Sequence, residues 1–518
     1  ATKLAEKLFS DPLTQDIEIG DRQDWDNSKT VEVAPLIGMM NPEAESIIYG
    51  AELLGVRPAA VDSSTEYRFT DRTSDTVISE VIRRVAMNEK VERIMVDTPD
   101  TLQITGKVGP IEIVPLCDLD DSGLASLSED RSLFLDIEEL KGAQAYFKGK
   151  GREPRDAELE TLGSHWSEHC GHKTFNAKIF KDGFEKSPLF PRLKNKSEEY
   201  FDDEIVSAFH DNAGVFLFYD GMCINIKLET HNSPSALDPY GGSMTGSGGV
   251  FRDGIGTGLG AKVILSIDIF CFADPHLDKE KLPETCLDPM YLQQRVIDGV
   301  RDYGNRMGIP TANGSIHYDD DFRAKPTVMV GELAIQPLEL AKKGAPVHGD
   351  LVVTMGGKTG RDGIHGATFS SGDMTNETAT IHSSAVQIGN AIEEKKLQDA
   401  ILEAGQTGCM RALTDCGAAG FASAITEMGS DIGVEVDISK APLKYNGMAP
   451  WEIWMSESQE RMIAAVIPEK YEEFAKICAK HGCEIAALGT FGTPEGQEPT
   501  LHVTYGDEEL IELEYDFL

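Results

Sequence analysis

Glycine is concentrated in two polar stretches of this 518-residue chain, and each lies beside runs of β-forming residues. The first stretch, GGSMTGSGGVFRDGIGTGLGAK, spans residues 241–262, and the second, GGKTGRDGIHGATFSS, spans residues 356–371. Glycine has no side chain, so the backbone N–H groups of such a stretch can approach an anion closely. Both stretches are therefore predicted to be loops that bind a phosphate-like group.

The β-like runs VFLFYD, CINIKLE, KVILSIDIFCF and PTVMVGELAI alternate with glycine-rich segments between residues 213 and 340. Residues 289–308 carry apolar side chains at helical spacing and are predicted to form a helix. A further unit starts near residue 345 with GDLVVTMGG, contains a long helical segment, and ends on the hairpin-like run TLHVTYGDEELIELEY. This mixture predicts an α+β fold with mixed sheets.

The first 175 residues divide into two smaller segments. In the first, KTVEVAPLIG is predicted to be a strand and AESIIYGAELLG a helix, which makes a small α/β domain. In the second, residues 104–135 are predicted to be irregular, residues 135–151 an amphipathic helix ended by glycine, and residues 153–170 a second helix with Pro154 in its first turn. Domains are expected at residues 1–103, 104–175, 176–343 and 344–518.

Composition excludes several classes of protein. A net charge of −39 argues against a nucleic-acid-binding protein, which needs a basic surface. A phosphate-bearing substrate would need divalent cations and nearby Arg or Lys to offset that charge. The sequence contains no run of eighteen apolar residues, so no membrane span is predicted. Its first residues lack the apolar core of a secretory signal. Nine cysteines without a C-x-x-C pair indicate reduced thiols and a cytoplasmic protein.

Two common nucleotide-binding motifs are absent. The run GGKT at 356–359 has Val352 where the first glycine of a phosphate-binding Walker A loop is required. The run GTGLGA at 256–261 fits the dinucleotide-binding pattern, but a β-like run follows it where that fold needs a helix. Any nucleotide site must therefore be built differently.

Polar residues cluster at four places. Lys227, Glu229 and His231 alternate along a predicted strand, which would put a cation, a carboxylate and an imidazole on one face, although a solvated strand face explains the same alternation. In the same cluster, Arg252 and Asp253 of the adjoining glycine-rich stretch offer a phosphate clamp beside a metal ligand. Arg361 with Asp362 repeats this pairing in the second cluster, which is the second glycine-rich stretch. The remaining clusters contain Asp415, before a glycine turn, and the run Glu457, Ser458 and Gln459. Together the clusters favour phosphate and metal chemistry over turn chemistry.

The run SHWSEHCGHK at 164–173 is a fifth polar segment. Glu168, His169 and His172 could share one helical face and bind a metal, although Gly171 is expected to end the helix. Cys170 could be a nucleophile, but no oxyanion-hole arrangement accompanies it, so a packed thiol is the preferred interpretation.

In this order, the motifs resemble phosphoribosylformylglycinamidine synthase, within the superfamily of aminoimidazole ribonucleotide synthetase. The matching strings are SEHCGHKTF, KLETHNSPSA, GSGGVFRD, YGNRMGIPT, TGRDGIHGATFSS, AVQIGN, LTDCGAAG and SESQERM. The first hundred residues resemble the small accessory subunit of the family more loosely. The resemblance implies an ATP- and Mg²⁺-dependent synthetase that converts formylglycinamide ribonucleotide to the amidine, through an iminophosphate, with ammonia from a glutaminase partner.

The resemblance also implies residue roles. His169 would be an active-site histidine and His231 the proton acceptor, while His172 and Lys227 would contact ATP. Glu229 would bind one Mg²⁺, and Asp253 with Asp415 a second. The ribonucleotide would be held by Thr230, Asn232, Ser233, Arg252, Gln387, Glu457, Ser458 and Gln459, with help from the TGRDGIHG loop.

The sequence departs from the family pattern at a few points. The family commonly has His at the position of Ser233 and Asp at the position of Asn390. The family chain contains two tandem copies of a two-domain unit, whereas this sequence matches the first copy. Either a second-half chain or a second copy of this chain would then complete the ATP site, or the sequence is a fragment of a longer chain. Two alternatives stay open: a non-catalytic nucleotide-binding or assembly subunit, and another ATP-dependent enzyme of the same superfamily.

Overall fold

We describe the fold from a computed structural model of the chain. It describes residues 2–9, 16–20, 27–36, 41–88, 91–96, 106–200, 204–283, 285–366 and 387–518. The chain divides into two compact units, Ala1–Thr105 and Gly106–Leu518. Within the described residues no helix is both long enough and apolar enough to cross a membrane.

The N-terminal unit is a small α/β structure. Its antiparallel sheet has the order β2-β1-β3, with β1 at Ser28–Pro35, β2 at Thr65–Thr70 and β3 at Glu92–Ile94. Helices α2, Pro42–Leu53, and α3, Asp75–Val81, complete the unit. A small apolar core contains Val33, Ile78, Ile82 and Met87. The strand and helix predicted between residues 29 and 53 are thus confirmed.

A helical segment precedes the larger sheets. It contains α4 (Asp121–Asp130), α5 (Ile137–Lys150), α6 (Asp156–His165), α7 (Glu168–Gly171), α8 (Lys173–Asn176), the hairpin β4–β5 (Ile179–Lys181 and Phe184–Lys186) and α9 (Leu189–Tyr200). Helix α5 ends at a glycine, as predicted: Gly151 caps its C-terminus in the left-handed conformation. A capping box at Asp136 begins the helix.

Two predictions for this segment were wrong. The run called irregular contains helix α4, because Asp120 caps its N-terminus and Leu124 enters the core. The single helix expected at 153–170 is two, because α6 ends at His165 and Ser167 caps the short helix α7.

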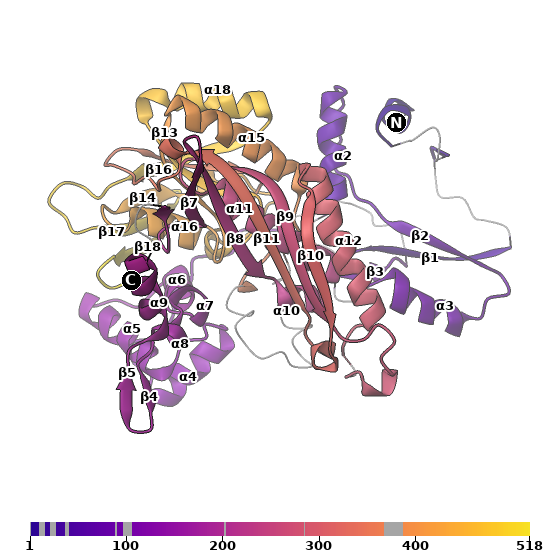
Figure 1. The fold of residues 1–518 in the computed structure, drawn as a ribbon, viewed down its shortest axis with the longest axis horizontal. Helices are drawn as coiled ribbons and strands as arrows, with labels where there is room; N and C mark the ends of the chain where they lie inside the picture. Colours follow the sequence, from indigo (N-terminus) through magenta and orange to yellow (C-terminus); the bar gives the residue numbers. More distant parts are fainter. Residues whose placement is uncertain are drawn as a thin grey trace. The chain divides into compact units, whose positions relative to one another are not determined.

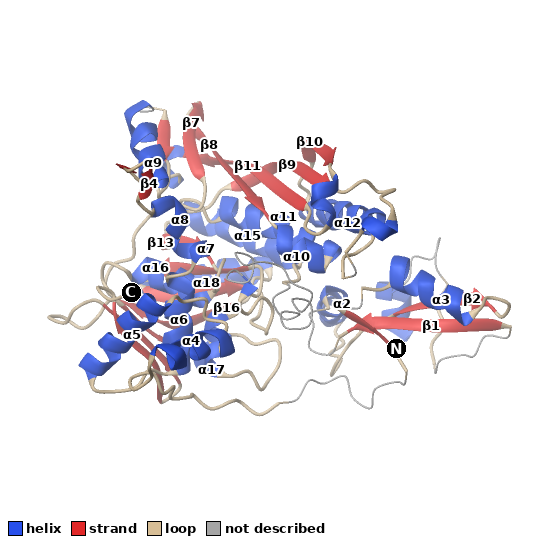
Figure 2. Cartoon of the chain, turned by 90° about the horizontal axis from the view of Figure 1, so that it is seen from below, coloured by secondary structure: helices blue, strands red, loops and turns tan. Residues whose placement is uncertain are grey.

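A six-stranded sheet follows, with the order β10-β9-β11-β8-β7-β6. Its strands are β6 (Ile205–Ser207), β7 (Gly214–Tyr219), β8 (Met222–Thr230), β9 (Lys262–Phe272), β10 (Thr311–Tyr318) and β11 (Thr327–Pro337). Helices α10 (Asn232–Leu237), α11 (Pro239–Ile255) and α12 (Pro289–Met307) lie together on one side of this sheet, which Figure 2 shows edge-on. The four predicted strands and the helix at 289–308 are confirmed.

The first glycine-rich stretch is a helix rather than a loop. Residues 241–255 belong to α11, so most of their backbone N–H groups donate within the helix and are not offered to an anion. A Cβ atom at Gly242 would lie 2.6 Å from the Pro234 carbonyl carbon, and one at Gly248 would lie 2.6 Å from Tyr303 Oη. The glycines therefore let α11 pack closely against α10 and α12.

A seven-stranded sheet forms the C-terminal part, with the order β13-β15-β12-β16-β14-β17-β18. Its strands are β12 (Leu351–Gly356), β13 (Met410–Asp415), β14 (Val434–Asp437), β15 (Arg461–Val466), β16 (Ile485–Phe491), β17 (Thr500–Tyr505) and β18 (Glu508–Glu514). Four helices accompany it: α15 (Ala391–Thr407), α16 (Phe421–Gly429), α17 (Pro450–Met455) and α18 (Tyr471–His481). Figure 1 shows this sheet beside the six-stranded one.

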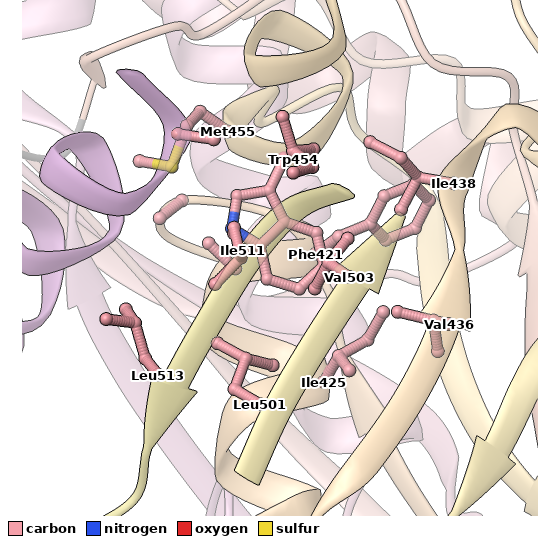
Figure 3. Packing of buried hydrophobic residues seen from close by; sticks show 14 of the residues in the cluster. Phe421, Ile425, Val436, Ile438, Trp454, Met455, Leu501, Val503, Ile511 and Leu513 are labelled. Atoms are coloured by element: carbon pink, nitrogen blue, oxygen red, sulfur yellow. The ribbon is translucent and has the colours of Figure 1, made fainter. Parts of the chain in front are cut away.

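Both faces of the seven-stranded sheet are buried. All six residues of β15 are buried, and alternate residues enter different cores. Ile463 and Ala465 join the core that contains Phe421 and Trp454, part of which Figure 3 shows against β17 and β18. Met462, Ala464 and Val466 join a second core with α12, α15 and α18.

Candidate functional site

A cavity of about 220 Å³ lies where both sheets, helices α10 and α11, and the SEHC segment meet. It is lined by most of the residues predicted for the site: His169, Glu229, Thr230, His231, Asn232, Ser233, Arg252, Gln387, Glu457 and Gln459. These side chains come from places up to 290 residues apart in the sequence. Only tertiary folding brings them to one cavity, at the end of β8 and beside α11.

Lys227 and Glu229 project from the same face of β8, as predicted, and Lys227 also reaches α11. Lys227 Nζ lies 2.7 Å from Asp253 Oδ2 and 3.3 Å from Glu229 Oε2. Burial alone would lower the pKa of Lys227, but the two carboxylates override it and raise that pKa. In the same way, desolvation would raise the pKa of Glu229, but the Lys227 ammonium lowers it. Lys227 therefore stays charged between two ionisable carboxyl groups.

The carboxyl groups predicted to bind Mg²⁺ are each next to a cation. Asp415 Oδ2 accepts a 3.3 Å hydrogen bond from Arg252 Nε. Burial, together with the nearby charge of Asp415, raises the pKa of Asp253 well above its usual value. Within the described ranges no group of three His, Cys, Asp or Glu side chains is arranged to hold a metal ion. The ammonium of Lys227 lies between Glu229 and Asp253.

These residues nevertheless fit Mg²⁺ by chemistry. Mg²⁺ prefers hard oxygen ligands, and it commonly uses one or two carboxylates together with substrate phosphates. The raised pKa of Asp253 shows that its charge lacks sufficient compensation from the protein. A divalent cation would supply that compensation. Glu229, Asp253 and Asp415 are therefore the groups that would hold it.

His231 has the hydrogen bonding of a proton acceptor. Its Nδ1 lies 2.5 Å from the Gly242 carbonyl oxygen, which can only accept, so Nδ1 carries the proton. In the neutral ring Nε2 is then the basic nitrogen. Burial lowers the pKa of His231 despite the opposing effect of Glu229, which keeps the ring neutral at physiological pH.

The two histidines of the SEHC segment have different environments. His169 lines the cavity, and desolvation lowers its pKa. His172, predicted to contact ATP, lies outside the cavity lining, in the left-handed conformation after α7, with its ring against Phe190. The shared helical face considered for Glu168, His169 and His172 is therefore not formed.

The predicted packed thiol at Cys170 was wrong. Cys170 is an exposed residue, although desolvation by neighbouring atoms raises the pKa of its thiol. A raised pKa disfavours the thiolate that a nucleophile or metal ligand requires.

A connected set of side chains forms the wall contributed by the C-terminal sheet. Arg252 is buried, and its Nη1 donates to Gln459 Oε1 at 2.8 Å. Gln387 donates from Nε2 to Glu457 Oε2, and Glu457 Oε1 accepts from the Ala419 N–H at 3.0 Å. These bonds hold the guanidinium, two amides and a carboxylate in fixed positions around the cavity.

The remaining predicted substrate residues divide into two groups. Thr230 and Ser233 line the cavity, and among the described residues the buried Ser233 hydroxyl has no hydrogen-bond partner, which leaves it for a ligand. Asn232 also lines the cavity, but its Oδ1 accepts from the Val328 N–H at 2.8 Å. Ser458 does not line it, because its hydroxyl donates to Asp362 at 2.6 Å.

The second glycine-rich stretch is described only as far as residue 366, so residues 367–371 lie outside the described part. Arg361 donates to Glu452 at 2.8 Å, and Asp362 is paired with Lys444 and Ser458. These pairs attach the loop to neighbouring segments of the C-terminal part. Only Gly366 of the described part lines the cavity.

Several lining residues were not predicted from the sequence, notably Thr245, Gly246, Gly249 and Lys325. The three on α11 were inside a stretch interpreted as a loop, so no helical face was considered. Lys325 precedes β11 in the run RAKPT, where a cation next to proline is an ordinary loop feature. It adds a cation at the cavity beside Arg252.

Comparisons with known proteins agree with this geometry. The family described as "AIR synthase related protein, N-terminal domain" matches residues 210–335, and the corresponding C-terminal domain matches residues 347–501. The "Formylglycinamide ribonucleotide amidotransferase linker domain" matches residues 124–173. These ranges contain most of the six-stranded sheet, most of the seven-stranded sheet, most of helix α4, and helices α5 to α7.

One curated relative is the "Phosphoribosylformylglycinamidine synthase subunit PurL" of Thermoplasma volcanium, which is 36% identical over 408 residues. That alignment covers 78% of this chain and 51% of the relative. The chain thus spans about half the length of the curated relatives that it matches.

Solved structures of PurL from Thermotoga maritima are also similar. The complex with FGAR has a TM-score of 0.57 and 29% identity, covering 73% of this chain and 55% of that one. The complex with ATP has a TM-score of 0.55 and 27% identity, covering 73% and 54%. A structure described as PurLQS has a TM-score of 0.54 and 27% identity, covering 73% and 54%.

Proposed function

We propose that this chain, which belongs to the AIR synthase related proteins, binds formylglycinamide ribonucleotide and ATP in the cavity and converts the amide to an amidine. The observation that supports this most strongly is the convergence of three kinds of group on one cavity. His231, Glu229 and the Arg252–Gln459 pair line it, and Glu229 is paired with Lys227, which is in turn paired with Asp253 outside the lining. They suit proton transfer, phosphoryl transfer and substrate binding respectively.

The proposed reaction has two steps. In the first, the amide oxygen of the ribonucleotide attacks the γ-phosphorus of ATP, ADP leaves, and the amide N–H gives up a proton. In the second, ammonia adds to the iminophosphate carbon, and the C–O bond breaks to release inorganic phosphate with the former amide oxygen. The ammonia nitrogen loses protons to form the neutral amidine. His231 is the base that we assign to proton removal, since its neutral form presents Nε2.

The cationic and acidic residues prepare the phosphate site. Lys227, which remains charged, and Lys325 offset the negative charge of the transferring phosphate. Mg²⁺, when bound, would supply further neutralisation of the ATP phosphates, and Glu229, Asp253 and Asp415 would hold it. Arg252 and Gln459 would orient the ribonucleotide, so that its amide faces the nucleotide.

We further propose that a second-half synthetase chain covers the open face of the six-stranded sheet. Ile226 and Leu228 point away from α11 on β8, beside Phe216 on β7, and are 37%, 45% and 36% exposed. An apolar sheet face of this kind is typical of a protein interface. The relatives have a further stretch of comparable length, so a chain of that kind is the expected partner, with ammonia supplied by a separate glutaminase.

The test is release of ADP and phosphate with formylglycinamide ribonucleotide, Mg²⁺ and an ammonium salt, for this chain alone and together with a second-half chain. Turnover is expected with the second-half chain. Glu229→Gln should lower that turnover by at least about a hundredfold, as for loss of a group that stabilises charge in the transition state. Glu185→Gln, in the β4–β5 hairpin, is the matched control.

Two outcomes would contradict the proposal. Absence of turnover in every combination, with folded protein that binds ADP, would favour a nucleotide-binding or assembly subunit. Turnover with another small molecule from a substrate panel, but not with the ribonucleotide, would favour a different ATP-dependent enzyme of the superfamily.

A further inference from the structure

A buried cluster of acidic and phenolic groups lies behind the cavity and has no role in the reaction described above. Tyr303 on α12, Glu394 on α15 and Glu460 before β15 are all buried. Tyr303 Oη lies 2.5 Å from Glu394 Oε2 and 2.8 Å from Glu460 Oε1. The Asn390 N–H donates to the same Glu460 oxygen at 2.7 Å.

Counting protons determines how these groups are bonded. A phenol has one proton, and an ionised carboxylate can only accept. Both contacts of Tyr303 can be hydrogen bonds only if one glutamate carries a proton and donates it to the phenol oxygen. Glu460 Oε1 already accepts from Asn390, whereas Glu394 Oε1 has no partner among the described residues. A buried carboxyl oxygen without a hydrogen-bond partner is less destabilising when the acid is neutral than when it is ionised. Glu394 is therefore the glutamate that carries the proton.

The pKa directions agree with this assignment. Burial raises the pKa of Glu394 well above its usual value. Burial raises the pKa of Glu460 to about 7, and the nearby charge of Arg252 opposes this rise. The chain of hydrogen bonds therefore runs from Glu394 to Tyr303 to Glu460, where it meets the Asn390 N–H.

This series of hydrogen bonds joins three segments that line the cavity. Gly248 of α11 packs on the phenol, because a Cβ there would lie 2.6 Å from Tyr303 Oη. Gly389, two residues after Gln387, packs on the ring from another side, with a Cβ position 2.8 Å from Tyr303 Cε2. Glu460 follows Gln459 directly and has a left-handed backbone, with φ of 57°.

The left-handed backbone of Glu460 requires support from its surroundings. A non-glycine residue in this conformation is strained and persists only where neighbouring contacts determine it. The Tyr303 and Asn390 bonds to its carboxylate supply such contacts, and the Gly357 N–H donates to its carbonyl oxygen at 2.8 Å. Gln459 is thereby held where Arg252 Nη1 bonds to it at 2.8 Å.

We propose that Tyr303, Glu394 and Glu460 are positioning residues that hold Gln387 and Gln459 in place for the ribonucleotide. This inference rests on the proposed function, because it assigns these residues to the ribonucleotide end of the cavity and not to ATP. Tyr303, Glu394 and Glu460 do not line the cavity, so they act only through the segments they join.

The test is calorimetric titration of the full chain with formylglycinamide ribonucleotide and, separately, with ATP and Mg²⁺. Tyr303→Phe is expected to raise the Kd for the ribonucleotide about tenfold, as for loss of a hydrogen bond to a charged group, and to leave the Kd for ATP within twofold. Tyr240→Phe is the matched control, since its phenol donates to Asp302 at 2.9 Å and lies outside the cavity lining.

A second pair of variants tests the proton assignment and does not depend on the folding of Tyr303→Phe. Glu394→Gln keeps a neutral donor to Tyr303 and should leave the ribonucleotide Kd within twofold. Glu394→Met removes the donor and should raise that Kd about tenfold. Equal effects of these two variants would overturn the proposal, as would equal changes in the Kd values for both ligands.

Failure of the two proposals can be distinguished. If the wild-type chain binds the ribonucleotide and Tyr303→Phe binds it equally well, only the positioning role is wrong. If the wild-type chain binds ATP but not the ribonucleotide, the proposed function and this inference are both wrong.

Discussion

The two large sheets differ in how their faces are covered. The seven-stranded sheet has apolar cores on both faces, and every residue of its strand β15 is buried. The six-stranded sheet is covered by α11 and α12 on one face, while Ile226 and Leu228 on its other face remain substantially exposed. One sheet is covered on both faces, and the other keeps an exposed apolar face, where we propose that a partner binds.

The cavity lies where these two kinds of sheet meet. Its wall with Glu457 and Gln459 comes from the segment before β15 of the fully buried sheet, while Glu229 and His231 lie at the end of β8 in the sheet with the open face. Binding groups on a rigid scaffold keep their geometry without a partner. We therefore expect ribonucleotide binding by the chain alone, and full activity only after the open face is covered.

The largest effect on stability is expected in the covered sheet. Trp454→Ala should lower the free energy of unfolding by about 3–5 kcal/mol, because this indole is fully buried and its N–H donates to Thr161 at 3.0 Å. Denaturant titration would measure it, with Trp454→Phe as a milder control. A loss below 1 kcal/mol would show that this core is not tightly packed.

A smaller effect is expected at the helix between the sheets. Gly248→Ala should destabilise the chain by about 1–3 kcal/mol, because the new methyl group would overlap Tyr303 Oη. Gly142→Ala on α5, where nothing lies within 4 Å of the added Cβ, should stabilise it by up to about 1 kcal/mol. Thermal unfolding of the two variants would contradict this account if they shifted in the same direction.

Two histidines, His165 and His365, are expected to make the free energy of unfolding depend on pH with opposite signs. Burial lowers the pKa of His165, so its contribution to stability is lost as pH falls through the unfolded value of 6.5. Burial would also lower the pKa of His365, but Glu160 raises it, so its contribution is present at low pH and lost as pH rises through the raised value.

Replacing either histidine with Gln isolates its contribution in denaturant titrations between pH 5 and 8. Relative to wild type, His165→Gln should gain stability as pH falls, and His365→Gln should lose it. Each difference can change by at most about 1.4 kcal/mol per pH unit, the limit for one proton. Differences of the same sign would refute the assignment.

The smallest effect on stability is expected on the open face. Leu228→Ser should change the free energy of unfolding by no more than about 0.5 kcal/mol, because the side chain is 45% exposed. The same variant should weaken association with a second-half chain, measured by sedimentation, whereas Glu508→Ser on β18 should not. Association of wild type only with itself would assign the open face to a second copy of this chain.

Much of the site was predictable because it lies at strand ends. The alternation in CINIKLE placed Lys227 and Glu229 on one face of β8, and Asp415 does end strand β13. Helix α4 and the glycine-rich helix α11 were not predicted. In both cases local composition indicates loop, and burial against other elements stabilises a helix instead.

The residues by themselves determined the alternating strands, the capped helix α5, the polar clusters and their resemblance to one family, because these depend on local spacing and residue type. Tertiary structure alone decided three other features. It made the glycines of α11 packing contacts, because a Cβ atom at these positions would overlap the neighbouring helices. It turned Ser458 out of the cavity, and it placed the chain Glu394–Tyr303–Glu460 behind the substrate wall, because residues from three distant elements become neighbours only when the core is packed.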